Sequence, residues 1–133
     1  MGKTRSTVLI VDDDPEIRSL LQDLLKREGY DTLVAETGID AIELLENGER
    51  PQLILTDLIM PGIIGHSLID YLRDEAELAS IPVVIITGSP QLAPAGYPVF
   101  SKPIRPRELF ELLRETCPPQ RRPAEDDSER LLV

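Results

Sequence analysis

The sequence has few of the residues that stabilise or mark several common classes of protein. It holds one cysteine, no tryptophan and only 4% aromatic residues in 133 positions. A single cysteine excludes an internal disulfide framework, which suits a reducing compartment, so we expect a cytoplasmic protein. Long apolar runs are missing too, because none approaches the roughly 20 residues of a membrane span, and the N-terminal segment lacks the h-region of a secretory signal.

Basic residues are also scarce. There are 14 Lys and Arg against 24 Asp and Glu, which gives a formal net charge of −10. An acidic domain without a basic patch is a poor match for nucleic acid or an anionic membrane, so we expect neither as a partner. His66 is the only histidine. That excludes a metal site built from several imidazoles, and we interpret His66 as a surface residue at the start of a helix.

Short apolar runs alternate with helical patterns along the chain. Strands are predicted at residues 7–11, 31–35, 52–56, 81–86 and 99–100, and helices after Asp14-Pro15, over 39–45, over 67–74 and from Pro106. Asp14 is expected to cap the first helix, with proline at its first position. The alternation predicts an α/β fold with a doubly wound parallel sheet and helices on both of its faces.

The composition changes near both ends of the chain. We expect residues 1–6 to be a short lead and residues 7–116 to form one domain. Residues 117–133 are rich in proline and mixed charge without periodicity, so they are predicted to be a disordered tail or the start of a linker. Cys117, at the start of this segment, is expected to be an exposed and inert thiol.

Polar side chains follow the strands at one edge of the predicted sheet, where ligands of open α/β sheets bind. Asp12 and Asp13 follow the first strand, Asp57 the third, Thr87 the fourth and Lys102 the fifth. Three converging carboxylates repel one another and favour a cation, for which oxygen ligands indicate Mg²⁺. Lys102 is a point charge suited to a phosphoryl oxygen, and Thr87 offers a hydroxyl. The set predicts phosphoryl transfer onto Asp57.

Four segments, LIVDDDPEIRSLLQDLL, LTDLIMPG, VVIITG and FSKPI, resemble the receiver domain of two-component response regulators. They occur in the family's order and extend over about residues 8–116. The resemblance implies a flavodoxin-like five-stranded parallel sheet with strand order 2-1-3-4-5. It also implies that Asp57 is a phosphoacceptor, filled from a histidine kinase or a histidine phosphotransfer protein.

The same resemblance implies the roles of the other residues at the sheet edge. Mg²⁺ would be held by the carboxylates of Asp12, Asp13 and Asp57 and by the backbone carbonyl of Ile59. Thr87 would move towards the phosphoryl group, and Lys102 would pair with it. The bond between this lysine and the proline that follows it is expected to be cis.

One stretch departs from the family's pattern, TGSPQLAPAGYPVFSKP at residues 87–103. The family has a helix of about three turns here. Pro90, Pro94 and Pro98 make a full helix unfavourable, because each interior proline costs about 3 kcal/mol and deletes a backbone donor. We therefore predict about four full helices in the whole domain and a degenerate fourth helix, with at most a single turn around 90–93.

A second departure lies at the end of this stretch. Val99 stands where receivers usually carry an aromatic switch residue. Strand alternation turns Phe100 to the opposite face, whereas Tyr97 lies on the Val99 face and is a candidate substitute. The surface from 92 to 99 is a candidate contact for a partner protein or for a second copy of this chain. A homodimer is therefore one of the alternatives.

Three functional hypotheses follow. The first is a phosphorylatable receiver that signals through protein contacts and is not an enzyme beyond its own phosphorylation and dephosphorylation; no output domain is expected after residue 116. The second is a pseudo-receiver or scaffold that binds partners whether or not Asp57 is phosphorylated. The third, a Mg²⁺-dependent aspartyl phosphohydrolase of the haloacid-dehalogenase type, is disfavoured because Pro15 follows the Asp12 and Asp14 pair at once.

Overall fold

The structure, a computed structural model, describes residues 6–57, 59–60, 63–64 and 66–118. Its main sheet contains β1 (Thr7–Val11), β2 (Asp31–Ala35), β3 (Leu53–Thr56), β6 (Val83–Thr87) and β7 (Val99–Ser101). All four pairings are parallel, in the order β2-β1-β3-β6-β7. Numbered by their sequence order in this sheet, the strands run 2-1-3-4-5, so the predicted fold class is confirmed.

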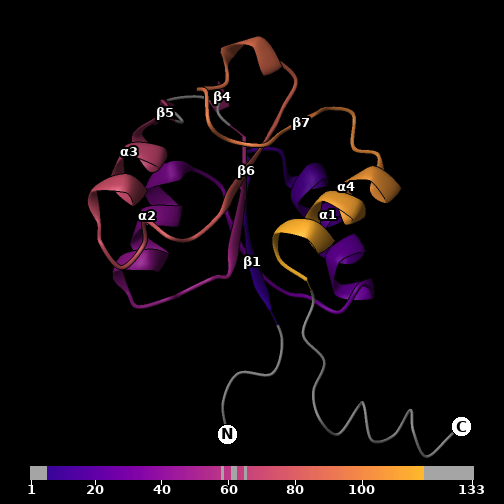
Figure 1. The fold of residues 1–133 in the computed structure, drawn as a ribbon, viewed down its shortest axis with the longest axis horizontal. Helices are drawn as coiled ribbons and strands as arrows, with labels where there is room; N and C mark the ends of the chain where they lie inside the picture. The colour runs from indigo at the N-terminus through magenta and orange to yellow at the C-terminus, as the bar shows by residue number, and fades with distance from the viewer. Residues whose placement is uncertain (1–5, 58, 61–62, 65, 119–133) are drawn as a thin grey trace, which may run out of the picture.

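Helices cover both faces of the sheet (Figure 1). On one side lie α1 (Pro15–Arg27) and α4 (Pro106–Thr116), and on the other α2 (Gly38–Glu46) and α3 (His66–Asp74). Strand β1 shows why both layers are needed, since all five of its residues are buried. Val8 and Ile10 belong to the core under α1 and α4, while Leu9 and Val11 belong to the core under α2 and α3. Alternation of side chains along the strand divides them between the two layers.

The helix starts follow local rules that the sequence already contains. The Asp14 side chain accepts a hydrogen bond from the Glu16 N–H at 2.9 Å, which makes it the predicted cap of α1. Thr37 caps α2 in the same way by accepting from the Asp40 N–H at 3.1 Å. Within the described part of the chain, no helix has the length and apolar character needed to cross a membrane.

A small antiparallel pair follows the third strand of the main sheet. β4 (Ile59–Met60) pairs with β5 (Ile63–Ile64), and the sequence patterns did not predict this pair. Two-residue strands are too short to show the alternation by which strands are recognised in a sequence.

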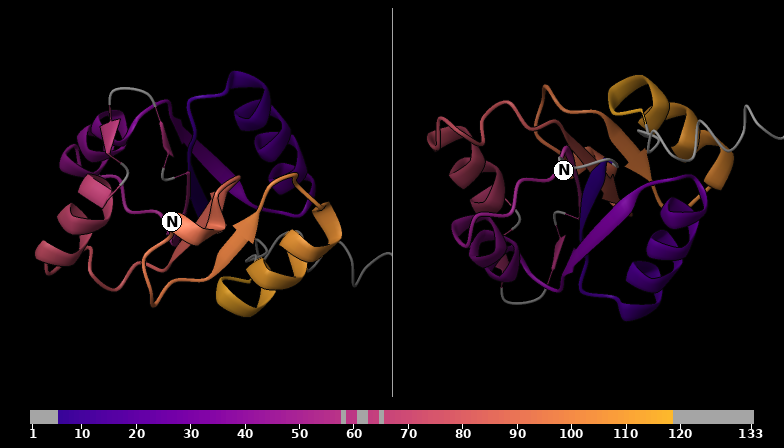
Figure 2. Two further views of the ribbon diagram at one scale, coloured as in Figure 1. Left: turned by 90° about the horizontal axis from the view of Figure 1, so that it is seen from above. Right: turned by 90° about the horizontal axis from the view of Figure 1, so that it is seen from below.

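The connection between β6 and β7, residues 88–98, lacks a full helix. It contains one turn of 3₁₀-helix, η1 (Pro90–Leu92), as the prolines predicted. Figure 1 shows this connecting segment beyond the ends of the strands, between α3 and α4, and the view from above in Figure 2 also places it between these helices. The Lys102–Pro103 peptide bond that follows β7 is cis, as the family resemblance implied.

Cys117 was predicted to be exposed, and that prediction is wrong. Its side chain is buried in the core beneath α1 and α4. The Tyr30 hydroxyl donates to the Cys117 carbonyl at 2.7 Å, and the Ser6 hydroxyl donates to the Pro118 carbonyl at 3.0 Å. The sequence after residue 116 predicted a tail because it has no periodic pattern. The residues that hold Cys117 and Pro118 in place, Tyr30 and Ser6, lie about 90 to 110 positions earlier in the chain. Residues 119–133, the rest of the predicted tail, lie outside the described residues.

The Tyr30 contact predicts a loss of stability in alkali. Burial, with a smaller contribution from Cys117, raises the pKa of the Tyr30 hydroxyl from 10.0 to about 12. The stabilisation is present below pH 10 and is lost as the pH rises towards 12, because the unfolded chain releases this proton more readily. The free energy of unfolding in urea should therefore fall by about 2 kcal/mol more in the wild type than in Tyr30→Phe over this range. Parallel pH dependences in the two proteins would contradict this.

Candidate functional site

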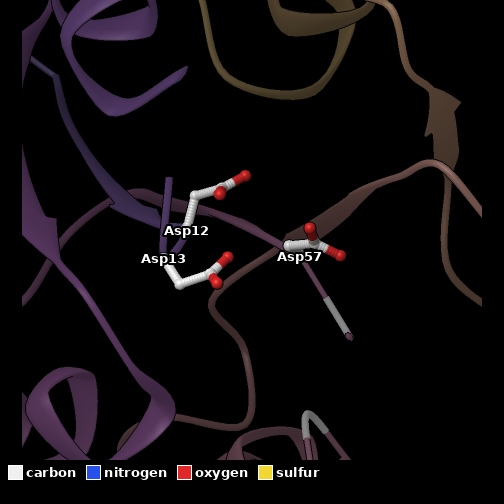
Figure 3. A group of neighbouring side chains, drawn as sticks. All are labelled: Asp12, Asp13 and Asp57. Atoms are coloured by element: carbon white, nitrogen blue, oxygen red, sulfur yellow. The ribbon is translucent and has the colours of Figure 1, made fainter. Parts of the chain in front are cut away.

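Two acidic residues of the site lie directly after the carboxyl ends of neighbouring strands. Asp12 follows β1, and its N–H donates to the Ala35 carbonyl of β2 at 3.2 Å. Asp57 follows β3, and its N–H donates to the Val11 carbonyl of β1 at 3.0 Å. Parallel pairing thus holds both backbones beside each other, so sequence positions 45 apart present their carboxylates to one edge (Figure 3).

Asp12, Asp13 and Asp57 form a cluster of carboxylates, which we call the acidic triad. One oxygen from each lies within 4.8 Å of the others. Asp12 is 2% exposed and Asp57 is 6% exposed, while Asp13 is half-buried. Burial raises the pKa of the Asp12 carboxyl above its ordinary value, despite opposing hydrogen bonds from the Asp14 N–H and Lys102. Proximity and burial both make the negative charge costly unless a cation balances it.

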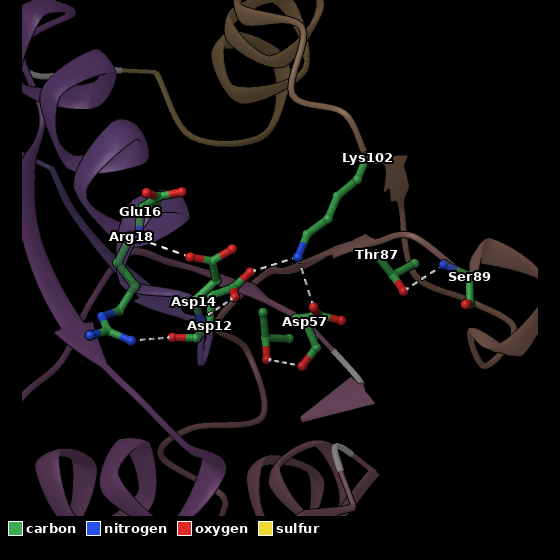
Figure 4. A network of polar contacts seen from close by, with 9 residues as sticks. Asp12, Asp14, Glu16, Arg18, Asp57, Thr87, Ser89 and Lys102 are labelled. Atoms are coloured by element: carbon green, nitrogen blue, oxygen red, sulfur yellow. Dashed lines mark hydrogen bonds and ion pairs between the residues drawn. The ribbon is translucent and has the colours of Figure 1, made fainter. Parts of the chain in front are cut away.

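Lys102 supplies one such positive charge. Its Nζ lies 2.9 Å from Asp57 Oδ2 and 3.0 Å from Asp12 Oδ2, and so bridges two members of the acidic triad (Figure 4). Burial lowers the pKa of Lys102, but the hydrogen bonds to Asp57 and Asp12 and their charges outweigh it, so the pKa is raised overall. The ammonium therefore stays protonated in the site.

Thr87 ends β6 on the same edge. Its side chain is buried, and its hydroxyl accepts from the Ser89 N–H at 3.0 Å (Figure 4). The Thr87 carbonyl accepts from the backbone N–H of Lys102 at 2.9 Å. A hydrogen bond therefore joins the two ends of the connecting segment. Thr87 and Lys102 stay side by side although the segment between them lacks a full helix.

Sequence patterns did not single out Arg18, yet it supports the acidic loop. Its Nη1 donates to the Asp12 carbonyl oxygen at 2.7 Å from the first turns of α1 (Figure 4). A guanidinium at the end of the first turn of a helix that follows an acidic loop is a signal that could have suggested this contact. Asp14 instead serves as the cap of α1, which leaves the Asp12 and Asp14 pair of the phosphohydrolase hypothesis without support.

The acidic triad suits Mg²⁺ by its chemistry. It offers carboxylate oxygens, which are the ligands that this hard cation prefers, and it offers few enough of them to leave places for water or a phosphoryl group. The single ammonium of Lys102 cannot balance three carboxylates. Ile59 opens β4, two residues after Asp57, and the part of its carbonyl as a further ligand remains a prediction.

Comparison with known proteins identifies the class to which this fold and site belong. The model of the response regulator receiver domain family matches residues 8–114. The chain belongs to this family, whose members are signalling phosphoacceptors rather than enzymes and act with histidine kinases.

Several relatives share much of the chain. An uncharacterized 14.6 kDa protein in the sodA1 3′ region of Leptolyngbya boryana is 32% identical over 117 residues, which are 83% of this chain and 88% of that protein. Protein PilH of Pseudomonas aeruginosa is 38% identical over 84 residues, covering 63% and 69% respectively. Other relatives are longer, and the chain spans about half of their length or much less. What those larger proteins do as a whole therefore does not carry over.

Solved structures agree on the fold. The response regulator protein TrrA from Thermotoga maritima, solved in complex with Mg(2+)-BeF, has a TM-score of 0.74 and 27% identity to this chain. The comparison covers 84% of this chain and 98% of that one. The relative's own structure thus contains magnesium, while the acidic triad described above is the feature of this chain that could hold such an ion.

Proposed function

We propose that this chain is the phosphoacceptor receiver of a two-component or phosphorelay pathway, accepting a phosphoryl group on Asp57 and signalling through protein contacts. The observation that carries the proposal is the position of Lys102 Nζ, which lies 2.9 Å from Asp57 Oδ2 beside the acidic triad. A carboxylate that attacks phosphorus needs positive charge next to it, because the transferring group is itself anionic.

The donor would be a phosphohistidine of a histidine kinase or a histidine phosphotransfer protein. A carboxylate oxygen of Asp57 attacks the phosphorus, the P–N bond breaks as the new O–P bond forms, and the imidazole leaves and takes up a proton. The Lys102 ammonium donates to one phosphoryl oxygen. The Thr87 hydroxyl, which already accepts from the Ser89 N–H, keeps its own proton to donate to another.

The metal would be held by the carboxylates of Asp12, Asp13 and Asp57 and by the carbonyl of Ile59. When bound, Mg²⁺ neutralises negative charge on the transferring group and on the acidic triad. Arg18 keeps the Asp12 backbone in place through its 2.7 Å hydrogen bond. We also propose a cytoplasmic location, where such kinases expose their phosphohistidines, and a receiver unit that extends over about residues 7–116.

Intact mass after incubation with acetyl phosphate and Mg²⁺ tests the proposal. The wild type should gain the mass of one phosphoryl group, and Asp57→Asn should gain none, because an amide oxygen is a poor nucleophile. Asp70→Asn is a matched control, since Asp70 is exposed on α3, and it should be phosphorylated like the wild type.

The opposite result would favour the scaffold hypothesis. The specific observation behind that hypothesis is the single turn η1 in place of a full helix, beside a half-exposed Val99 at the usual aromatic position. A wild type that gains no mass with acetyl phosphate or with partner kinases, although it still binds Mg²⁺, would contradict the phosphoacceptor proposal.

A further inference from the structure

The two carboxylates that follow β1 lie in one cluster although they belong to consecutive residues. Successive side chains of an extended strand point to opposite sides, and Ile10 and Val11 at the end of β1 do so, since they pack in opposite layers of the core. Asp12 and Asp13 both reach the acidic triad, with oxygens within 4.8 Å of each other (Figure 3). The chain bends at Asp13, so the orientation of the peptide unit between these two residues decides where the second carboxylate points.

Hydrogen bonds hold the side chain of Asp12, whereas the side chain of Asp13 depends on its backbone. The Asp12 N–H donates to the Ala35 carbonyl at 3.2 Å. The two carboxylate oxygens of Asp12 accept from the Asp14 N–H at 2.9 Å and from Lys102 Nζ at 3.0 Å. Among the described residues, none donates a hydrogen bond to the Asp13 carboxylate, so its direction follows from the peptide unit that precedes it.

The carbonyl of that peptide unit is held by Arg18. The Asp12 carbonyl oxygen accepts from Arg18 Nη1 at 2.7 Å (Figure 4). A peptide unit is planar, so a bond that fixes the direction of one carbonyl also fixes the N–H and the Cα of the next residue. Through this bond Arg18 sets the direction in which Asp13 leaves the loop, although the two side chains make no contact of their own.

Arg18 reaches the loop because of its place in α1. Its N–H donates to the Asp14 carbonyl at 3.0 Å, which puts it one turn after the cap. Side chains of a helix lean towards its N-terminus, and here that direction leads back over the acidic loop. A positive charge in the first turn opposes the helix dipole, so α1 by itself gains nothing from an arginine at this position. The contact outside the helix is what this half-buried side chain provides.

We infer that Arg18 is the positioning residue of the metal site, and that its guanidinium holds the peptide unit between Asp12 and Asp13 so that both carboxylates face one divalent cation. The inference rests on the proposed function in that this cation is the Mg²⁺ of phosphoryl transfer. A purely electrostatic role of Arg18 makes the opposite prediction, because a positive charge beside a cation site weakens cation binding. The two roles therefore differ in sign, and a variant without the guanidinium separates them.

Titration of unphosphorylated, isotope-labelled protein with Mg²⁺, followed in amide NMR spectra, measures the affinity. Arg18→Met removes the charge and the donors, and it should bind Mg²⁺ about tenfold more weakly than the wild type, as is common when an outer hydrogen bond of a metal site is lost. Arg18→Lys keeps the charge and one donor group, and it should recover most of the affinity. Arg27→Met removes the same charge from the exposed last turn of α1, and it should bind Mg²⁺ like the wild type.

The metal-free spectra give a second measurement. In Arg18→Met the amide resonances of Asp13 and Asp14 should shift, because the peptide unit before them is released. The resonance of Leu113, buried near the end of α4, should not shift. Arg18→Gln repeats both measurements with a shorter uncharged side chain, and circular dichroism melting checks that each variant is folded.

The phosphorylation rate with acetyl phosphate separates metal binding from the chemical step. In Arg18→Met the Mg²⁺ concentration that gives half the maximal rate should rise about tenfold, while the maximal rate should change less than about threefold. An affinity of Arg18→Met and Arg18→Gln for Mg²⁺ that equals or exceeds that of the wild type would overturn the inference, and so would an equal loss in Arg27→Met.

These outcomes are distinct from a failure of the proposed function. A wild type that binds Mg²⁺ through the Arg18-dependent site, but gains no phosphoryl group, would overturn the proposed function and support the inference. A wild type that is phosphorylated, beside an Arg18→Met variant with unchanged Mg²⁺ affinity, would overturn the inference alone. A wild type that binds no Mg²⁺ would overturn both.

Discussion

Replacing Lys102 by methionine is expected to lower the free energy of unfolding by about 3 kcal/mol in the absence of divalent cations. The ammonium bridges Asp12 and Asp57, which are both buried, and its own side chain is 24% exposed. Methionine fills much of the same volume without the charge. Loss of the ammonium increases the mutual repulsion of three carboxylates that have oxygens within 4.8 Å of one another. Urea denaturation in EDTA, followed by circular dichroism, measures the change.

Magnesium should then stabilise the variant more than it stabilises the wild type. In Lys102→Met the metal would be the main positive charge in the acidic triad, whereas in the wild type the lysine already offsets part of the repulsion. Lys26→Met in the last turn of α1 is the control, because Lys26 is exposed, and it should change stability by less than about 0.5 kcal/mol. An equal gain from Mg²⁺ in wild type and variant would count against this account of the site.

Phe100→Ala should lower the free energy of unfolding by about 3–5 kcal/mol, an effect as large as that expected for Lys102→Met. The Phe100 ring is buried in the core beneath α1 and α4, where truncation would leave a cavity. Val99→Ala, one residue earlier on the same short strand, should cost less than about 1 kcal/mol, because that side chain is partly in solvent. Urea denaturation measures both changes. Because the two substitutions lie on the same strand, the comparison separates the effect of the buried face of β7 from that of its exposed face.

A similar loss of stability in both variants would mean that the edge of the sheet depends on strand propensity rather than on which face of the strand is packed.

The outward position of Val99 also bears on signalling. The residue at the usual aromatic position faces outward here as a valine, while the nearest aromatic that packs on the same side as α3 is Tyr97, held by Arg73. Whether Tyr97 acts as a switch residue remains a prediction.

Local chemistry accounts for much of what could be predicted from the residues. Continuous apolar runs predicted β1, β3 and β6, since these strands are buried along their whole length. The Asp14-Pro15 start of α1 and the prolines at 90, 94 and 98 act on their own backbone, so their effects needed no tertiary information. The ends of β6 were less predictable: it runs over Val83–Thr87 rather than 81–86.

The residues of the site were predictable for a related reason. The carboxyl ends of parallel strands lie on one edge, so Asp12, Asp57, Thr87 and Lys102 could be assigned to one place from strand order alone. The distances could not. That Lys102 Nζ bridges Asp12 and Asp57 depends on side-chain conformations and on the hydrogen bond between the Thr87 carbonyl and the Lys102 N–H.

By itself, then, the sequence determined the alternation of strands and helices, the loss of the helix before β7 and the identity of the acidic and cationic groups at one sheet edge. These follow from backbone restrictions and from the two-residue and 3.6-residue periods, which are local. Only the tertiary structure decided that Cys117 is buried, that Arg18 holds the Asp12 carbonyl and that Arg73 meets Tyr97. Those contacts join residues whose spacing in the chain carries no periodic signal, so packing alone brings them together.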